Sequence, residues 1–292
     1  QESKKRSGAE YSIIVISGNF VQRGNTSLIN KWVKTHMALL NGADLVIELP
    51  TIYSISSAEN FADGAIKIFN ELKIVDTISF GTETDDISIL NNIANILYQE
   101  PKQYRTMLAH ELCKGISFPK ARENAILLYL NDIKRYANIL GSSNNILAIE
   151  YLKAMKKRKS NIKPMAIKRE KVYYNDEHIV DEYASATAIR NLIKTEQYEE
   201  IRKVMPRECY MMLREEIKRG NIVTDLSKLE KEIIYNLRRM SQQEIANLPD
   251  VSEGLDKSIK VSANSCNNFN SLINIIKSKR FTRYKNSKNI II

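Results

Sequence analysis

The chain has 292 residues, of which 43% are hydrophobic and 27% charged, and it carries a formal net charge of +10. This composition is that of a globular protein, the length suits two domains or one large one, and no apolar run approaches the roughly 20 residues that cross a bilayer. The three cysteines, Cys113, Cys209 and Cys266, are widely spaced, which argues against a disulfide framework or a zinc ribbon and favours a reducing cytoplasm.

The positive charge lies entirely in the second half of the sequence. Residues 1–149 contain 15 basic and 15 acidic residues, whereas residues 150–292 contain 29 basic and 19 acidic residues. Such asymmetry favours a polyanionic partner for the second half, most simply nucleic acid. From charge alone, a lysine-rich solvated surface explains the excess equally well.

The first 80 residues alternate between strand and helix patterns. Short β-branched runs predict buried strands, and apolar residues recurring at intervals of three and four predict amphipathic helices. This alternation is typical of a parallel, doubly wound α/β sheet. The predicted elements are a strand at Tyr11–Ser17, a helix at Leu28–Leu40, a strand at Asp44–Leu49, a helix at Ala58–Leu72, and a strand at Ile74–Phe80 that is stopped by Gly81.

The remaining sequence is predicted to be mostly helical. One further strand is expected at Ile162–Ile167, and a helix at Ala184–Lys194 closes the α/β part. We therefore expect residues 1–195 to form the α/β domain and residues 196–292 a helical, basic region. The other predicted helices are Ile87–Tyr98, Tyr104–Cys113, Pro119–Tyr129, Asn145–Lys156, Glu196–Met205, Arg207–Arg219, Leu226–Met240, Ser241–Leu248 and Asn270–Lys279.

Polar residues follow the first predicted strand, where parallel α/β sheets bind their ligands. Asn19, Gln22 and Arg23 lie in a loop bounded by Gly18 and Gly24. Glycines let the backbone approach a ligand closely, and an arginine there would pair with phosphate or carboxylate. Taken alone, the loop reads more readily as a simple strand-to-helix turn.

Three further patterns are candidate anion sites. Ser185 and Thr187 can cap a predicted helix whose free N–H groups favour phosphate, and Arg190 lies one turn further along. Capped helices with an arginine are common, so the bare pattern is weak. Asn144 opens another predicted helix, where a capping role is the default, and Arg169 follows the last predicted strand.

Several familiar motifs are absent from the sequence. It contains no GxxxxGK[ST], GxGxxG or GxSxG segment. The three histidines, His36, His110 and His178, lack the spacing of metal ligands, so no metal site is predicted. No protein partner can be inferred from these patterns.

Longer blocks carry a resemblance to a known family. SGNFVQRG, NKWVKTHMALLNGADLVIELP, SAENFADGAIKIFNEL, FGTE, SSNNILAIEYLKA, IKRE and SATAIR follow one another along the chain. Over roughly residues 1–283 the sequence resembles the bacterial tRNA(Met) cytidine acetate ligases. The resemblance implies a Rossmann-like nucleotidyltransferase domain with a parallel sheet, followed by a mostly helical RNA-binding part.

This resemblance also implies an ATP-dependent, cytoplasmic ligase with two reaction steps. Acetate and ATP, with Mg²⁺ as the default metal, would form acetyl-adenylate, and the acetyl group would pass to N4 of the wobble cytidine of elongator tRNA(Met). The family's ATP contacts fall on Gly81, Asn144 and Arg169. Ser185, Thr187 and Arg190 occupy the position at which related nucleotidyltransferases bind phosphates, a less specific correspondence. We expect Asn19, Gln22 and Arg23 to line the region of acetate and the α-phosphate.

The sequence departs from the family at both ends. Family members open with a strand and an HxGH segment whose histidines stabilise the pentavalent phosphate, and no HxGH occurs here, so we expect the first strand to be missing and adenylate formation to be impaired. Shortly after Arg283 the sequence reads KNSKNIII where family members have a RIQRILL-like block. Possible codons for KNSKNIII give RIQRILL when they are read one frame along, which suggests a frameshift. The alternative functions are a catalytically inactive tRNA-binding remnant and an adenylyltransferase for a small phosphorylated metabolite, which leaves the basic half without a role.

Overall fold

The computed structural model describes residues 2–22, 24–136, 139–169, 184–224, 226–248, 251 and 254–276. The chain divides into two compact units, and each unit is made from two separate stretches of sequence. Unit 1 comprises Gln1–Tyr11 and Ala58–Ala188, and unit 2 comprises Ser12–Ser57 and Ile189–Ile292. Both units thus contain residues of the predicted α/β domain, and the boundary near residue 195 stays a prediction.

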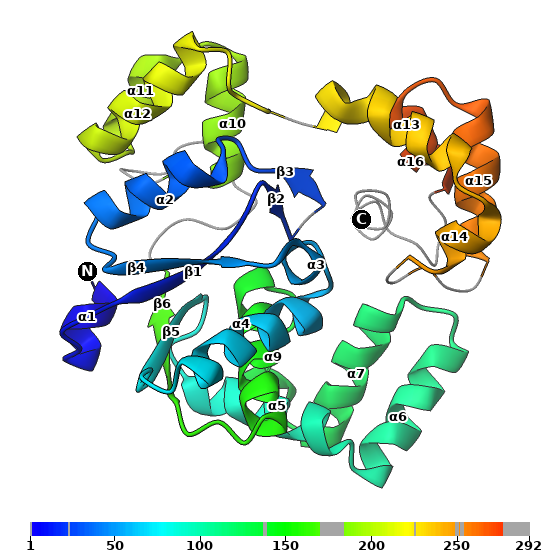
Figure 1. Ribbon diagram of the computed structural model, residues 1–292. Helices are drawn as coiled ribbons and strands as arrows, with labels where there is room; N and C mark the ends of the chain where they lie inside the picture. Colours follow the sequence, from blue (N-terminus) through cyan, green and yellow to red (C-terminus); the bar gives the residue numbers. More distant parts are fainter. Residues whose placement is uncertain are drawn as a thin grey trace. The chain divides into compact units, whose positions relative to one another are not determined.

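Unit 1 is built on two parallel strands with helices packed against them (Figure 1). Strand β5 (Thr77–Thr82) pairs with β6 (Lys163–Lys168), and Thr77 lies opposite Lys163. Apolar side chains of β5 and of six helices form one core, with Phe80 and Leu90 among its members. The helices are α1 (Glu2–Ser7), α4 (Ala58–Leu72), α5 (Ile87–Gln99), α6 (Lys102–Cys113), α7 (Phe118–Leu130), α8 (Ile133–Tyr136) and α9 (Ser143–Lys157).

Unit 2 contains the other parallel pair and most of the basic helices. Strand β1 (Ile13–Ser17) pairs with β4 (Leu45–Leu49), and β2 (Phe20–Val21) forms a short antiparallel hairpin with β3 (Asn25–Thr26). The α10 helix (Ala186–Lys194) begins at the end of unit 1 and continues into unit 2. The other helices are α2 (Lys31–Leu40), α3 (Thr51–Ser54), α11 (Tyr198–Lys203), α12 (Arg207–Lys218), the 3₁₀ helix η1 (Leu226–Leu229), α13 (Glu230–Arg239), α14 (Gln242–Ala246), α15 (Leu255–Ser265) and α16 (Phe269–Ile276).

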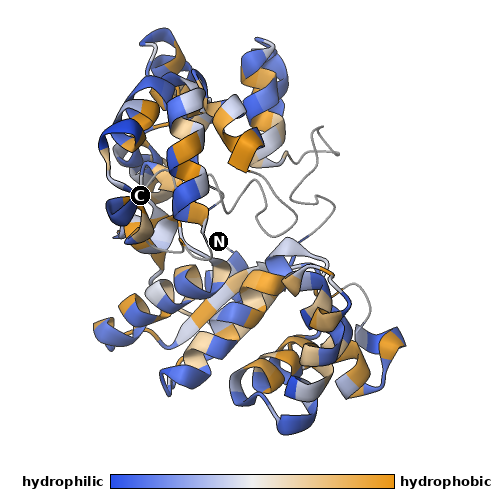
Figure 2. Cartoon of the chain, turned by 90° about the vertical axis from the view of Figure 1, so that its right-hand side faces the viewer, coloured by the Kyte–Doolittle hydropathy of each residue, from blue (hydrophilic) through white to orange (hydrophobic). Residues whose placement is uncertain are grey.

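Two separate apolar cores stabilise unit 2. One lies among α2, α10, α11 and α12 and includes Ile193, Ile201 and Leu213, with Val33 of α2 packed against it, and the other lies among α13, α14, α15 and α16. Figure 2 shows orange and blue residues alternating along the helices, as expected for helices with one buried face. The apolar residues that recur at helical spacing in the sequence are therefore the ones that form these cores.

Helices α13 and α15 cap each other's carboxyl ends. Arg238 of α13 donates from Nε to the carbonyl of Ala263 at 2.8 Å and from Nη2 to that of Cys266 at 2.7 Å. In return, Lys260 of α15 donates to the carbonyls of Leu237, Arg238 and Met240 at the end of α13. Each helix end, where carbonyls lack partners and the dipole is negative, receives a cation from its neighbour.

The α/β class and the parallel strand pairs are confirmed, with specific corrections. The strands form two separate parallel pairs in the described part of the chain, not one extended sheet. Gly81 does not stop β5 but lies within it, opposite Ile167. The β2–β3 hairpin, α3 and α15 were not predicted. None of the helices in the described ranges is long and apolar enough to cross a membrane.

Candidate functional site

The carboxyl ends of β5 and β6 bring Gly81 and Arg169 together in unit 1. The Arg169 N–H donates to the carbonyl of Thr82 at 2.8 Å and extends the parallel ladder by one bond. The Arg169 side chain lies over Gly81, because a Cβ placed on this glycine would be 3.3 Å from the arginine Cγ and 3.4 Å from its Cδ. The glycine therefore leaves room for the arginine, which is why the strand tolerates a residue that ordinarily weakens strands.

Asn144 lies in the first turn of α9 and faces the same strand end. Its Oδ1 accepts a hydrogen bond from Arg169 Nη1 at 3.4 Å, and its Nδ2 donates to Glu83 Oε1 at 2.8 Å. Glu83 directly follows β5, so this carboxylate links the strand end to the helix start. The structure thus brings together Gly81, Asn144 and Arg169, three residues distant in sequence.

Glu83 and Asn145 bind each other's backbone reciprocally. The Glu83 carboxylate accepts from the backbone N–H groups of Asn144 at 3.3 Å and Asn145 at 2.8 Å. The buried Asn145 side chain in turn accepts from the N–H of Glu83 at 2.9 Å and of Thr84 at 3.4 Å. The N-terminus of α9 is therefore capped by a residue about 60 positions away rather than by its own asparagines.

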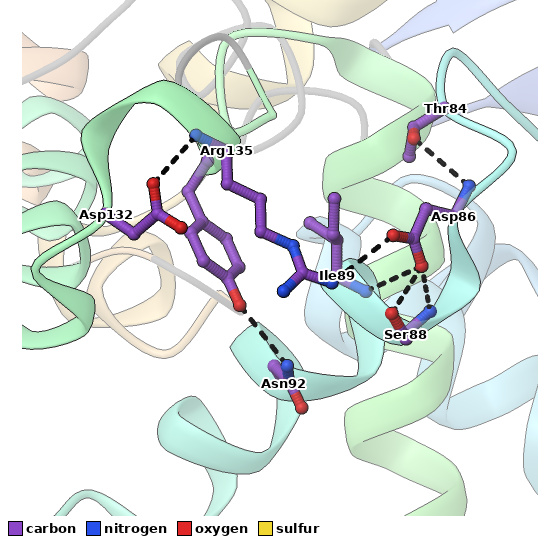
Figure 3. Close-up of polar contacts among 8 residues, drawn as sticks. Thr84, Asp86, Ser88, Ile89, Asn92, Asp132 and Arg135 are labelled. Atoms are coloured by element: carbon purple, nitrogen blue, oxygen red, sulfur yellow. Dashed lines mark hydrogen bonds and ion pairs between the residues drawn. The ribbon is translucent and has the colours of Figure 1, made fainter.

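The chain that follows Glu83 is fixed by a second polar network (Figure 3). The Asp86 side chain caps α5 by accepting from Ser88 and from the N–H of Ile89, and the Ser88 hydroxyl holds the pKa of this carboxyl below its usual range. Arg135 lies 3.5 Å from Asp86, and the neighbouring Tyr136 hydroxyl accepts from Asn92 at 3.2 Å. The segment around α8 is thereby attached to the start of α5.

The Asn19 loop belongs to unit 2 and forms the β2–β3 hairpin. Asn19 Oδ1 accepts from the N–H of Lys31 at 3.0 Å, so the side chain ties the loop to the start of α2. Gln22 lies in the hairpin turn, which is closed by the N–H of Gly24 donating to the Val21 carbonyl at 2.9 Å. Arg23 lies outside the described residues. The role of this loop toward acetate and the α-phosphate stays a prediction.

Sequence reasoning missed a lysine beside this loop. Lys34 Nζ donates to the Gly18 carbonyl at 2.9 Å and to Ser27 Oγ at 3.2 Å. Burial lowers the pKa of this ammonium, opposed by the charge of Glu48 and reinforced by that of Arg190. The signal in the sequence was its position one turn beyond Asn30, the N-cap of α2, on the side that returns to the first strand end.

Replacing Gly18 by alanine is expected to destabilise this strand end. The added Cβ would lie 2.1 Å from Glu48 Oε1, and moving that carboxylate breaks its 2.6 Å ion pair with Lys31. Because the carboxylate can move aside and the ion pair is partly exposed, we expect the free energy of unfolding, measured by urea denaturation, to fall by about 1 kcal/mol. In Gly18→Ala/Glu48→Ala the clash is gone, so the alanine should cost less there than in the single variant. Equal costs in both backgrounds would contradict this explanation.

The Ser185–Arg190 segment forms the start of α10 as predicted. Ser185 Oγ accepts from the N–H of Ala188 at 3.0 Å, which is the geometry of a helix cap, and Thr187 is partly exposed in the first turn. The Arg190 guanidinium donates to three backbone carbonyls, those of Thr26 at 2.6 Å, Thr224 at 3.0 Å and Val223 at 3.5 Å. Phosphate binding by this segment stays a prediction.

Nucleotide binding is the chemistry that the unit 1 cluster can support. It offers an arginine, an amide and a glycine at the carboxyl ends of parallel strands, where α/β sheets bind nucleotides. Among the described residues, no three histidine, cysteine, aspartate or glutamate side chains gather closely enough to hold a metal ion. The Arg169 guanidinium gives the cluster a donor group for an anionic ligand.

Comparisons with known proteins agree on one family. A family model described as HIGH Nucleotidyl Transferase matches residues 1–290. The tRNA(Met) cytidine acetate ligase of Acetivibrio thermocellus is 42% identical over 287 residues, which covers 97% of this chain and 69% of the relative. The protein of the same name from Caldanaerobacter subterraneus subsp. tengcongensis is 43% identical over 282 residues, covering 97% of this chain and 70% of the relative.

Solved structures show the same similarity. The apo crystal structure of Thermotoga maritima TmcAL superposes with a TM-score of 0.92 at 32% identity, covering 99% of this chain and 69% of that one. The structure of the same protein with alpha-thio ATP gives a TM-score of 0.89 at the same identity and coverage.

Proposed function

The chain belongs to the tRNA(Met) cytidine acetate ligase family, and we propose that it takes part in ATP-dependent acetylation of N4 of the wobble cytidine of elongator tRNA(Met). One observation carries the proposal: Gly81, Asn144 and Arg169, the expected ATP contacts, meet at the carboxyl ends of β5 and β6. A relative at 32% identity has been crystallised with alpha-thio ATP, which supports nucleotide binding by this fold.

The proposed reaction has two balanced steps. A carboxylate oxygen of acetate attacks the α-phosphorus of ATP, the bond to the bridging oxygen breaks, and pyrophosphate leaves. The cytidine N4 amine then attacks the acetyl carbonyl, AMP leaves, and N4 gives up one proton. Orientation of the reactants and stabilisation of phosphate charge are the contributions that the protein must make.

Each residue of the unit 1 cluster has a proposed part in this reaction. Arg169 pairs with a nucleotide anion, since its guanidinium is exposed and carries several donors. Asn144 donates to or accepts from the nucleotide, and Gly81 leaves the space in which Arg169 lies. Ser185, Thr187 and Arg190 are proposed phosphate contacts.

Other ligands would be held elsewhere in the chain. Asn19, Gln22 and Arg23 are the proposed contacts to acetate and the α-phosphate. Mg²⁺ would accompany ATP and be held mainly by its phosphates, because the described residues present no cage of carboxylates. The basic second half is the proposed tRNA-binding part, and we expect the protein to act in the cytoplasm, where tRNA is available.

Substituting Arg169 tests the nucleotide site. We expect Arg169→Ala to weaken ATP binding at least about tenfold in titration calorimetry, because a charge-assisted hydrogen bond is lost. Arg202→Ala is the matched control, since Arg202 lies in α11 with an exposed side chain. Unchanged ATP affinity in Arg169→Ala would count against the proposed site.

Two further measurements test the substrates. Acetate-dependent release of pyrophosphate is expected in the presence of elongator tRNA(Met). Binding of that tRNA should weaken steeply with salt. Salt-sensitive tRNA binding without any pyrophosphate release would instead support an inactive tRNA-binding remnant.

A further inference from the structure

We propose that Glu83 is a positioning residue, which fixes the Asn144 side chain in the orientation that the nucleotide site requires. The inference rests on the proposed function and concerns the same site. Glu83 accepts three hydrogen bonds from α9: from Asn144 Nδ2 at 2.8 Å, from the Asn144 N–H at 3.3 Å and from the Asn145 N–H at 2.8 Å. Within the described residues, Glu83 is the one carboxylate that hydrogen-bonds to Asn144.

The carboxylate determines which way the Asn144 amide faces. An ionised carboxylate only accepts hydrogen bonds, so it selects the NH₂ end of the asparagine amide. With Nδ2 held by Glu83, Oδ1 is directed to Arg169 Nη1 at 3.4 Å. Glu83 thereby sets the positions of both the amide and, through it, the arginine that lies over Gly81.

Glu83 also changes what the start of α9 can bind. Helix N-termini attract anions because their N–H groups are unpaired and the dipole is positive there. Here the N–H groups of Asn144 and Asn145 already donate to a carboxylate of the protein itself. Contact with a nucleotide anion at this strand end therefore falls to the side chains of Asn144 and Arg169.

Asn145 makes the arrangement rigid. Its buried side chain accepts from the N–H groups of Glu83 and Thr84, so the loop after β5 and the start of α9 hold each other through bonds in both directions. Moving Glu83 would break its bonds to the start of α9 and also those that its own backbone makes to Asn145. The backbone bond from Glu83 to Asn145 thus holds the Glu83 side chain in the place from which it positions α9.

Glu83→Gln separates this role from a general effect of charge. A carboxamide has one oxygen and one NH₂ group in place of two oxygens. It can therefore accept from only one of its two donors, Asn144 Nδ2 or the Asn145 N–H, and its NH₂ group faces the other donor without forming a hydrogen bond. We expect ATP to bind about tenfold more weakly, measured by calorimetry with ATP alone. Asp85→Asn is the control, since it removes the same charge from the same loop. The Asp85 side chain is 77% exposed, and its Oδ2 forms only a long ion pair, at 3.8 Å from Lys168 Nζ.

Two results decide the matter where the wild-type chain binds ATP. The inference is supported if Glu83→Gln binds ATP more weakly than wild type, Asp85→Asn stays within twofold of wild type, and Glu83→Asp binds ATP more tightly than Glu83→Gln. A cooperative melting transition must show that Glu83→Gln is folded. An ATP affinity within twofold of wild type in Glu83→Gln overturns it. If Glu83→Gln does not fold, Glu83→Asp is measured instead. Weaker ATP binding in Glu83→Asp than in Asp85→Asn then supports the inference, and equal binding overturns it.

Failure of the proposed function gives a different result. If the wild-type chain binds no ATP, the nucleotide site itself is refuted. Hydrogen exchange at the backbone amides of Asn144 and Asn145 then tests Glu83 without a ligand: at least about tenfold faster exchange in Glu83→Gln but not in Asp85→Asn supports its positioning role. Equal exchange in both variants overturns it.

Discussion

Replacing Arg190 by methionine is expected to lower the free energy of unfolding of unit 2 by about 3 kcal/mol, because the guanidinium donates to three backbone carbonyls. Thr26, whose carbonyl accepts at 2.6 Å, is itself 4% exposed, so water replaces the lost donor poorly. The arginine joins β3 to the chain that follows α12, across 164 positions of sequence between Thr26 and Arg190. Chemical denaturation measures the loss.

Two comparison variants sharpen this expectation. Arg190→Lys keeps the charge but has a single nitrogen that cannot reproduce the fork, so it should fall between wild type and Arg190→Met. Arg202→Met removes an exposed arginine whose nearest carboxylate is 3.6 Å away, and its effect should stay within about 0.5 kcal/mol. If Arg190 served phosphate binding alone, Arg190→Met would lose ATP affinity and keep its stability.

Asp63→Asn is expected to cost about 2 kcal/mol of unfolding free energy at pH 7. Asp63 of α4 and Arg158 at the end of α9 form a bidentate pair, with Nε to Oδ1 at 2.7 Å and Nη2 to Oδ2 at 2.6 Å. The two side chains are only 19% and 28% exposed, so screening by water is limited. Asparagine keeps the shape but removes the negative charge that pairs with this partly buried guanidinium.

The same pair predicts an acid-sensitive stability. The hydrogen bonds and charge of Arg158 hold the pKa of Asp63 below its usual value. The stabilisation is therefore fully present above the unfolded-state pKa of about 3.9 and disappears as the pH falls through the lower, folded-state pKa. Urea denaturation should show a constant difference between wild type and Asp63→Asn from pH 5 to 8 and a shrinking one toward pH 3.

An exposed acidic residue provides the control for the Asp63 experiment. Glu200 pairs with Lys203 one turn along α11, and its side chain is 42% exposed. Glu200→Gln should change stability by no more than about 0.5 kcal/mol at either pH. A difference between wild type and Asp63→Asn that persists undiminished at pH 3 would show that the asparagine acts through packing and not through charge.

Strand positions and one cluster could be predicted from the sequence. The β-branched runs ending near Ser17, Leu49 and Phe80 mark real parallel strands, because buried strands leave a local signature in composition. Gly81, Asn144 and Arg169 were grouped by resemblance to a family, and the structure brings them together. No local pattern could have grouped them, since strand pairing sets their distance.

The partner of Asn144 could not be predicted. Glu83 lies 61 residues away, and an acidic residue after a strand has many possible partners. Likewise, Arg190 sits one turn into a capped helix, as its spacing indicates, but its carbonyl partners come from remote segments. Long-range polar contacts of this kind depend on tertiary structure, which spacing does not encode.

The α15 helix was missed for a different reason. Leu255, Ile259 and Ala263 recur every four residues and are buried in the core of the α13–α16 helices. The intervening serines and asparagine have lower helix propensity and weaken the pattern in a single sequence. Attention to the apolar period alone would have found the helix.

The mutual capping of α13 and α15 bears on how tightly the basic half could hold a polyanion. All three N–H groups of the Lys260 ammonium are taken by carbonyls, and Arg238 also donates to carbonyls. Such cations still attract phosphates at long range, but they cannot displace condensed counterions by direct contact. The slope of affinity against salt should therefore report fewer phosphate contacts than the net charge of +10 suggests.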